Sequence, residues 1–442
     1  MTSPRPLTLV LALAGLFAGS AQAQNLVDVY NMAKSYDASY QSAQAQYESD
    51  VYRAAQAKAG LLPQVGVSAS STRTNFDNTT GPVVTNRDYT TNNASINASQ
   101  PLYRPAAWAT YEQSGKQAVS ARARLAAAEQ DLILRVTVAY FEVLSAQDNL
   151  TLVQAQKTAV AEQLAVAKRN FEVGVSTITD TRESEARFDQ VVAGEIGAEN
   201  DLNVKRLALD QLVGKPGIQP KPLAIPFTPP PVNPPNVEAW VAESATSHPA
   251  VIQNRLQIEL ARMETQKAEA GHKPTVDLVA SYGTSRNPNG SATTGYSSHT
   301  NSGNIGVSLN WPLFSGFAVQ NRIKETLSLE DKAAADLNAT ERAVAQATRS
   351  AFFGLKSGIS QIKALETAVA STQSAVESNK LGYQVGVRIN LDVLNAQTQF
   401  YTTKRDLDLV RYNVLTGGLK LRLANGTLKS VDLDAVNAFL AK

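Results

Sequence analysis

Alternating apolar and small polar residues mark four short stretches of the chain. They cover residues 64–70, 94–99, 276–282 and 305–311. A period of two is typical of β-strands with one apolar face and one polar face. We therefore predict two pairs of strands. The sequence between the members of each pair is rich in Asn, Gly, Ser and Thr and predicts long loops over residues 75–88 and 287–304.

Helical spacing of apolar residues predicts three helices in each half of the chain. Pro63 and Pro274 are expected to end the first helix of each half. A helix of about 70 residues is about 100 Å long, which no globular core requires. Its mostly small apolar residues suit helices packed side by side into a wall. The predicted helices cover residues 25–59, 104–171 and 177–213, then 237–270, 316–383 and 390–424.

The second half of the chain repeats the first half in the same order. Pro63 recurs as Pro274, and a Val-Gly-Val motif at residues 173–175 recurs at residues 385–387. Matching positions keep a nearly constant shift, which indicates an internal duplication. We divide the chain into a signal peptide (1–23), a first repeat (24–215), a Pro-rich linker (216–236), a second repeat (237–426) and a C-terminal tail (427–442).

The N-terminus has the features of a secretory signal peptide. Arg5 precedes an apolar run over residues 7–18, and Ala21 and Ala23 form a small-x-small cleavage pattern. The run is too short for a bilayer core, which needs about 20 residues. No later segment has an apolar run of that length, so a mature chain that crosses a membrane is expected to do so as a closed barrel.

Composition excludes several other classes of function. The chain has no Cys, which excludes disulfides, thiolate zinc sites and Cys nucleophiles. Its three His residues, His248, His272 and His299, lie in unrelated contexts. A formal charge of +2 argues against a nucleic-acid partner. Without a phosphate loop, a nucleophile elbow or metal-ligand spacing, we predict no enzyme activity, no cofactor and no metal site.

Four strands cannot close a barrel, because the smallest single-chain membrane barrels have about eight. Two copies would supply eight strands and three copies twelve, and an eight-stranded lumen would be filled by side chains. A soluble sandwich would explain one strand pair, and an intramolecular coiled coil would explain the helices. A barrel extended by a helical tube explains both.

Two helix-turn segments and two shorter motifs resemble the TolC family of outer-membrane channel-tunnels. The segments are NFEVGVSTITD at residues 170–180 and GYQVGVRINLDVLNA at residues 382–396, and the motifs are AGLLP at 59–63 and RYN at 411–413. The resemblance implies an α+β membrane protein. It would form a homotrimeric twelve-stranded β-barrel in outer-membrane lipid, with four strands per chain, continued by a long α-helical tunnel in the periplasm.

The same resemblance implies an outer-membrane exit duct of a tripartite export system. Such a duct docks with a periplasmic adaptor protein and an inner-membrane transporter, and it passes proteins or small toxic molecules to the exterior. Two alternatives stay open on the sequence: a periplasmic coiled-coil structural or adaptor protein without a pore, and a stand-alone diffusion porin.

Asp392 and Asn395 are candidate residues of a pore constriction. They are three positions apart, hence on one helical face near the start of a returning helix. An Asp in a first helical turn also complements the helix dipole, which requires no pore. The resemblance implies that both lie at the periplasmic aperture, where a ring of carboxylates favours cations. The family has a second Asp ring there, which Asn395 replaces.

The resemblance also implies roles for the residues around the two Val-Gly-Val turns. Thr179, Asp180, Tyr383 and Arg388 match positions whose hydrogen bonds and salt bridges hold neighbouring helix tips closed. Exposed charges at a turn are ordinarily worth less than about 1 kcal/mol. The exposed tip rim is a candidate adaptor contact or a local apolar staple, and it consists of Val173, Gly174, Val175, Val385, Gly386 and Val387.

Overall fold

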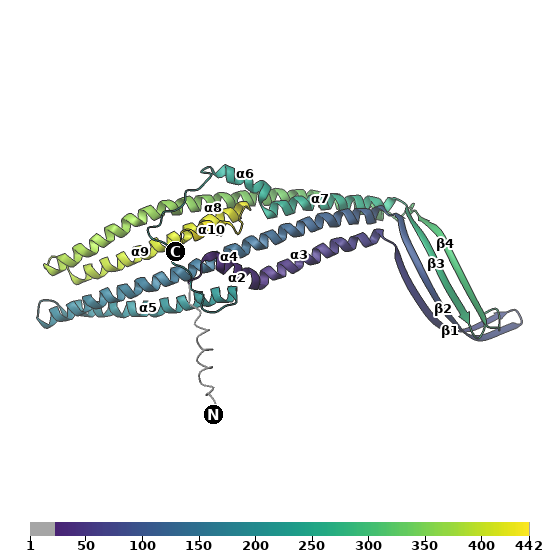
Figure 1. Ribbon diagram of the computed structural model, residues 1–442, viewed down its shortest axis with the longest axis horizontal. Helices are drawn as coiled ribbons and strands as arrows, with labels where there is room; N and C mark the ends of the chain where they lie inside the picture. Colours follow the sequence, from purple (N-terminus) through teal and green to yellow (C-terminus); the bar gives the residue numbers. More distant parts are fainter. Residues whose placement is uncertain (1–22, 442) are drawn as a thin grey trace, which may run out of the picture. The chain divides into compact units, whose positions relative to one another are not determined.

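The computed structural model describes residues 23–441 (Figure 1). Residues 1–22, which include most of the predicted signal peptide, lie outside the described residues. Within the described range, no helix is both long enough and apolar enough to cross a membrane.

The elements follow the same order in both halves of the chain (Figure 1). In the first half they are α2 (Leu26–Tyr36), α3 (Ala38–Ala57), the short 3₁₀ helix η2 (Lys58–Leu61), β1 (Gln64–Thr80), β2 (Val83–Tyr103), α4 (Pro105–Glu172) and α5 (Ile178–Val213). In the second half they are α6 (Val237–Ser247), α7 (Pro249–Glu269), η3 (Ala270–His272), β3 (Thr275–Asn287), β4 (Ser298–Asn310), α8 (Ala318–Gln384), α9 (Asn390–Asn425) and α10 (Asp432–Asn437).

The chain forms two compact units. The first contains the described residues up to Gln44, together with Ala126–Val251 and the residues from Glu341 onward. The second contains Ala45–Leu125 and Ile252–Thr340, and it includes all four strands. Helices α4 and α8 each contribute one part to each unit.

The four strands form one antiparallel sheet in the order β1-β2-β3-β4 (Figure 1). Ile96 pairs with Val67 on one side and Tyr282 on the other, so these three apolar side chains share a face. Asn97, the next residue of β2, pairs with Ser281 on the opposite face. The prediction of strands with one apolar face and one small-polar face is therefore confirmed.

Strands β1 and β4 are the two edges of this sheet, and each pairs with one neighbour among the described residues. The apolar face is open as well: Val65 is 70% exposed and Ile305 is 79% exposed. An unpaired edge and an exposed apolar face are both features that proteins normally cover. The sheet therefore indicates that surroundings beyond a single chain complete it.

The predicted long loop over residues 75–88 is wrong. β1 and β2 remain paired up to a two-residue turn at residues 81–82. Polar contacts extend the pairing between the strands: Arg73 forms an ion pair with Asp88 at 3.1 Å, and the Asn75 amide donates to the same carboxylate at 2.7 Å. Residues typical of loops thus form an exposed strand pair, because cross-strand polar contacts stabilise it.

The predicted loop over residues 287–304 is too long at both ends. β3 and β4 leave only residues 288–297 between them, and polar residues on each side join the ladder. β4 ends at Asn310, so Trp311 falls just outside the strand. Its indole N–H donates to the carbonyl oxygen of His272 at 3.1 Å.

The long helices agree with the sequence prediction to within two residues at each end. α4 and α8 have 68 and 67 residues, and α5 and α9 have 36 each. Gly214 and Gly426 end the returning helices with φ angles of 74° and 82°. This left-handed conformation suits Gly. Both glycines are also crowded: a Cβ would lie 2.4 Å from the Tyr36 ring or 2.3 Å from the Cα of His248.

The prediction of one continuous helix over residues 25–59 is wrong, because the helix breaks at Asp37. The Asp37 carboxylate accepts the backbone N–H of Tyr40 at 2.7 Å and thereby caps α3. Arg135 of α4 donates two further hydrogen bonds to it, at 2.9 and 3.0 Å. These hydrogen bonds hold the pKa of Asp37 below its usual value.

The predicted helix over residues 237–270 breaks at the matching position, His248. Pro249 begins α7, and a proline disfavours the helical conformation in the residue before it. The His248 ring accepts the backbone N–H of Ala250 through Nδ1 at 3.2 Å. Burial lowers the pKa of His248, which favours the neutral ring that this hydrogen bond requires.

The Pro-rich linker packs against residues near the beginning and the end of the described chain, all within the first unit. Gln24 forms a β-bridge with Pro220, and Leu223 forms one with Leu440. Within the same region the rings of Phe227 and Phe439 meet edge to face, 5.6 Å apart. The linker and the C-terminal tail are therefore parts of a packed region.

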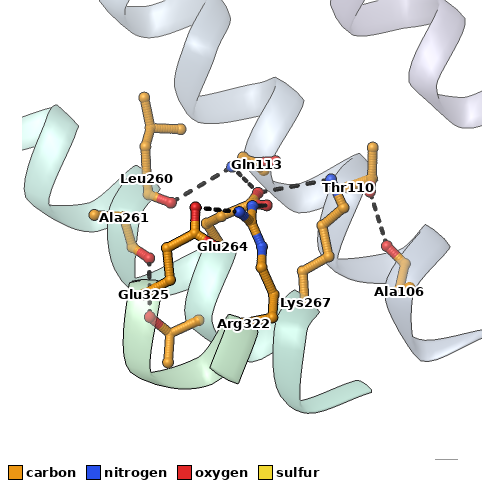
Figure 2. Close-up of polar contacts among 10 residues, drawn as sticks. Ala106, Thr110, Gln113, Leu260, Ala261, Glu264, Lys267, Arg322 and Glu325 are labelled. Carbon is orange, nitrogen blue, oxygen red and sulfur yellow. Dashed lines mark hydrogen bonds and ion pairs between the residues drawn. The ribbon is translucent and has the colours of Figure 1, made fainter. Parts of the chain in front are cut away.

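In the second unit, Glu264 of α7 ties together three helices (Figure 2). Its carboxylate accepts from Arg322 of α8 at 2.8 Å and from Gln113 of α4 at 3.3 Å, and Lys267 lies 3.6 Å away. Arg322 also pairs with Glu325 at 2.8 Å. Burial raises the pKa of Glu264, but the hydrogen bonds and nearby cations outweigh it and leave the pKa below its usual value.

We predict that Gly426→Ala destabilises the protein by more than about 1 kcal/mol, because this position has a positive φ that alanine disfavours and the new Cβ would meet the backbone at His248. The matched control is Gly418→Ala in the same helix, where a Cβ meets no atom within 4 Å. Alanine there should stabilise the helix by about 0.5–1 kcal/mol. Apparent thermal midpoints from circular dichroism compare the two, and equal midpoints would contradict the prediction.

Candidate functional site

The turns that join α4 to α5 and α8 to α9 share one backbone geometry. Gly174 and Gly386 both have a φ angle of 79°. The residue after each Gly donates its N–H to the carbonyl oxygen five positions earlier, at 2.9 Å in both turns. This is the hydrogen bond of a Schellman-type helix end. Both glycines therefore adopt the left-handed conformation that commonly ends a helix.

The valines beside these glycines point into solvent in the single chain. Val173 and Val385 are 67% and 65% exposed, and Val175 and Val387 are 73% and 78% exposed. Exposed branched side chains on two adjacent turns form a small apolar rim. The two turns contact each other through Asn170, whose amide donates to the Tyr383 hydroxyl at 3.2 Å.

A buried amide at the start of α9 connects three helices just behind the turns. Asn390 is fully buried, and its Nδ2 donates to the Ser184 hydroxyl at 2.6 Å and to the backbone oxygen of Asp180 at 3.1 Å, both on α5. Its Oδ1 accepts from Gln163 of α4 at 2.6 Å. Each hydrogen-bonding group of the amide is used across helices, so Asn390 sets how α4, α5 and α9 meet.

Asp180 and Asp392 occupy duplicate positions but have different partners. The Asp180 carboxylate accepts from the backbone N–H and the hydroxyl of Thr177, at 3.1 and 3.0 Å, and so completes a capping box. Ile389 replaces Thr177 in the second repeat and provides no side-chain cap. The Asp392 carboxylate instead lies 3.7 Å from the Arg388 guanidinium of the preceding turn.

The four predicted tip-link residues therefore do not form one cluster within the described chain. Thr179 is exposed in the first turn of α5, and Asp180 is occupied by its capping box. Tyr383 binds Asn170, and Arg388 pairs with Asp392. Links between tips of neighbouring copies stay a prediction.

Asp392 and Asn395 lie on the side of α9 that is accessible to solvent in the single chain. Val393 and Leu394 between them are fully buried, whereas Asp392 is half-buried and Asn395 is exposed. The Asn395 amide oxygen accepts from Arg187 of α5 at 3.2 Å. An arginine from the neighbouring helix is thus brought to the predicted constriction pair.

Sequence reasoning missed Asn390 and Arg187. Asn390 had a visible signal, because its duplicate position is the apolar Ile178, and a polar residue in place of an apolar one deserves explanation. Arg187 had none. Its contact with Asn395 joins residues 208 positions apart, and nothing in the spacing along α5 indicates it.

The RYN motif at residues 411–413 has a structural role in the first unit. The buried Tyr412 donates from its hydroxyl to Asp148 of α4 at 2.5 Å. Burial raises the pKa of Asp148. Arg411 pairs with Asp408 of its own helix at 3.1 Å and with Glu366 of α8 at 3.2 Å. The motif therefore fastens α9 to both long helices.

Comparison with known proteins identifies close relatives along nearly the whole chain. A family model described as outer membrane efflux protein matches residues 8–215 and 240–427. Outer membrane protein TolC of Vibrio cholerae is 34% identical over 436 residues, covering 98% of this chain and 97% of that protein. The proteases secretion protein PrtF of Dickeya chrysanthemi is 32% identical, covering 98% of this chain and 94% of its own length.

The fold is also found among solved structures. The crystal structure of CusC, described in terms of transmembrane channel formation, superposes with a TM-score of 0.79 over 91% of this chain and 92% of that chain. The two sequences are only 15% identical. At this low identity, the similarity supports the fold alone.

We predict that Asn390→Ala destabilises the packing of α9 by about 2 kcal/mol, because it removes the acceptor of the buried Gln163 amide and one of the two hydrogen bonds of the buried Ser184 hydroxyl. The matched control is Asn379→Ala, since that amide donates to the Ala375 carbonyl oxygen of its own helix in an exposed position. Hydrogen exchange should accelerate at the start of α9 in the first variant. Equal exchange in both variants would contradict the role of Asn390.

Proposed function

The chain belongs to the outer membrane efflux protein family, and we propose that it is the outer-membrane exit duct of a tripartite export system. Its location is the outer membrane, with the helices in the periplasm. The strong similarity to both TolC and a proteases secretion protein supports a transport role without catalysis. Cargo enters from an inner-membrane transporter through a periplasmic adaptor, and it consists of proteins or small toxic molecules.

The four-stranded sheet is the observation that carries this proposal. Among the described residues its two edges are unpaired and its apolar face is exposed, while the other face presents small polar residues such as Asn97 and Ser281. Three copies would join edge to edge into twelve strands, with the apolar face toward lipid and the small polar face around a wet lumen. A pore-free periplasmic coiled coil gives no reason for such a sheet.

The two helix turns are the proposed periplasmic end of the duct. Asp392 and Asn395 would line its constriction. Thr179, Asp180, Tyr383 and Arg388 would hold neighbouring tips together in the closed state. The exposed valines at residues 173, 175, 385 and 387, with Gly174 and Gly386 between them, would form the rim that the adaptor contacts; their exposure supports this role.

We predict that the edge strands of neighbouring copies can be linked by disulfides. The chain has no Cys, so introduced thiols are the only ones present. Ser68→Cys on β1 is combined with a second Cys substitution at one of four positions on the same face of β4. At least one of these pairs should form a disulfide between β1 of one copy and β4 of its neighbour. A covalent ladder up to the trimer is expected on a denaturing gel without reductant. The β4 positions to be scanned are Ser302, Asn304, Gly306 and Ser308.

The control places both thiols inside one chain. Asn97 and Ser281 are registered partners on the central strands β2 and β3. Their double Cys variant should cross-link within the monomer and migrate as a single chain. A monodisperse monomer in detergent, together with no covalent oligomer from any of the edge pairs, would refute the trimer.

We predict that Arg388→Ser raises the single-channel conductance in a planar bilayer, because a guanidinium that links tips in the closed state is removed. Arg405→Ser is the control: Arg405 lies on α9, the helix that follows Arg388, is exposed and pairs with its neighbour Asp406 at 2.9 Å. Its conductance should remain that of the unaltered chain. If both variants conduct equally, Arg388 has no role in closure.

A further inference from the structure

Arg187 and Asn395 form a contact that the proposed function does not use. The guanidinium of Arg187 crosses from α5 to α9 and donates from Nη2 to the Asn395 amide oxygen at 3.2 Å. Its other terminal nitrogen lies 3.5 Å from Gln190 Oε1, at the limit of a hydrogen bond. Both partners are neutral amides, so neither cancels the positive charge of Arg187.

Asp392 therefore has Arg388 of the preceding turn on one side and, at Asn395, Arg187 of α5 on the other. Arg388 lies one turn before it at 3.7 Å, and Asn395 with its bound Arg187 lies one turn after it. Glu183, one turn before Arg187 on α5, adds a second carboxylate on the same flank. The formal charges of Asp392, Glu183, Arg388 and Arg187 sum to zero in each chain.

Three other charged residues of this part of α5, Asp180, Arg182 and Glu185, have partners of their own. Arg182 pairs with Glu185 at 2.9 Å, and the Asp180 carboxylate is held in its capping box. Arg182 lies about 140° around the helix from Arg187, given about 100° per residue. It is therefore a charge of the same kind on a different side of the same helix.

We propose that Arg187 is a selectivity-determining residue of the duct, which neutralises the aperture so that anionic solutes and acidic polypeptide segments are not repelled. The proposal rests on the proposed function, in which Asp392 and Asn395 line the constriction. It also gives a reason for Asn395: a carboxylate at this position would pair with Arg187 and cancel its charge, whereas an amide holds the guanidinium and leaves it charged.

The test measures ion selectivity of the full-length trimer in planar bilayers under a potassium chloride gradient. The unaltered chain should pass potassium and chloride with similar permeability. Arg187→Gln removes three positive charges from the ring, which should raise the cation-to-anion permeability ratio about threefold at moderate salt. It should also lower the concentration of hexamminecobalt(III) that halves the conductance.

Two further variants separate charge from structure. Arg187→Lys keeps the charge and should keep the selectivity of the unaltered chain. Asn395→Asp adds the carboxylate instead and should shift selectivity in the same direction as Arg187→Gln, so it supplies the test if Arg187→Gln does not assemble. Arg182→Gln is the matched control and should leave the permeability ratio unchanged.

Each outcome decides the proposal. A strongly cation-selective unaltered channel, or equal selectivity in the unaltered chain, Arg187→Gln and Asn395→Asp, would overturn it while leaving the duct intact. An equal shift in Arg182→Gln would also overturn it, since any surface charge would then suffice. A chain that forms no channels in any version would instead refute the proposed function.

Discussion

Backbone hydrogen bonding at the two edges of the sheet is the constraint on which the rest of the structure depends. Within the part of the chain that the structure describes, β1 and β4 each leave one row of N–H and C=O groups unpaired. In hydrocarbon each such group costs several kcal/mol. Four strands cannot curl into a closed ring, so closure needs further copies. Because the number of strands per chain is even and all are antiparallel, β4 of one copy meets β1 of the next in antiparallel order, and identical copies can close the ring.

The two repeats share the positions where helices break and end, but different side chains stabilise these positions in each repeat. Helix breaks at Asp37 and His248, and left-handed ends at Gly214 and Gly426, occupy matching positions. The means differ, since a carboxylate caps α3, whereas a proline and an imidazole shape the start of α7. Ile389 stands where the first repeat has the capping Thr177. Asp392 therefore forms no capping box, whereas its duplicate Asp180 does.

The sequence predicts those features that depend on local pattern. The period of two indicates the faces of all four strands, and the Val-Gly-Val motifs indicate where the long helices end. Local reasoning fails where tertiary contacts override propensity. Polar residues 75–88 look like a loop but pair across strands, and Asp37 breaks a helical pattern because Arg135, far away in sequence, binds it. Asn390 and Arg187 likewise depend on partners more than 200 positions away. Whether Asp392 and Asn395 line a constriction stays a prediction.

The contacts around Asp392 differ in how they respond to movement of the helices. Arg388 lies in the turn directly before α9, four positions from Asp392, so their ion pair is local to the start of this helix. Arg187 and Asn395 lie on two helices, and a displacement of α9 against α5 by about 1 Å would lengthen their 3.2 Å contact beyond hydrogen-bonding range. The buried Asn390 resists the same displacement, because its amide binds α5 and α4 together. A duct that opens by separating these helices would therefore release Arg187 from Asn395, and the position of this positive charge at the mouth would change together with the width of the mouth.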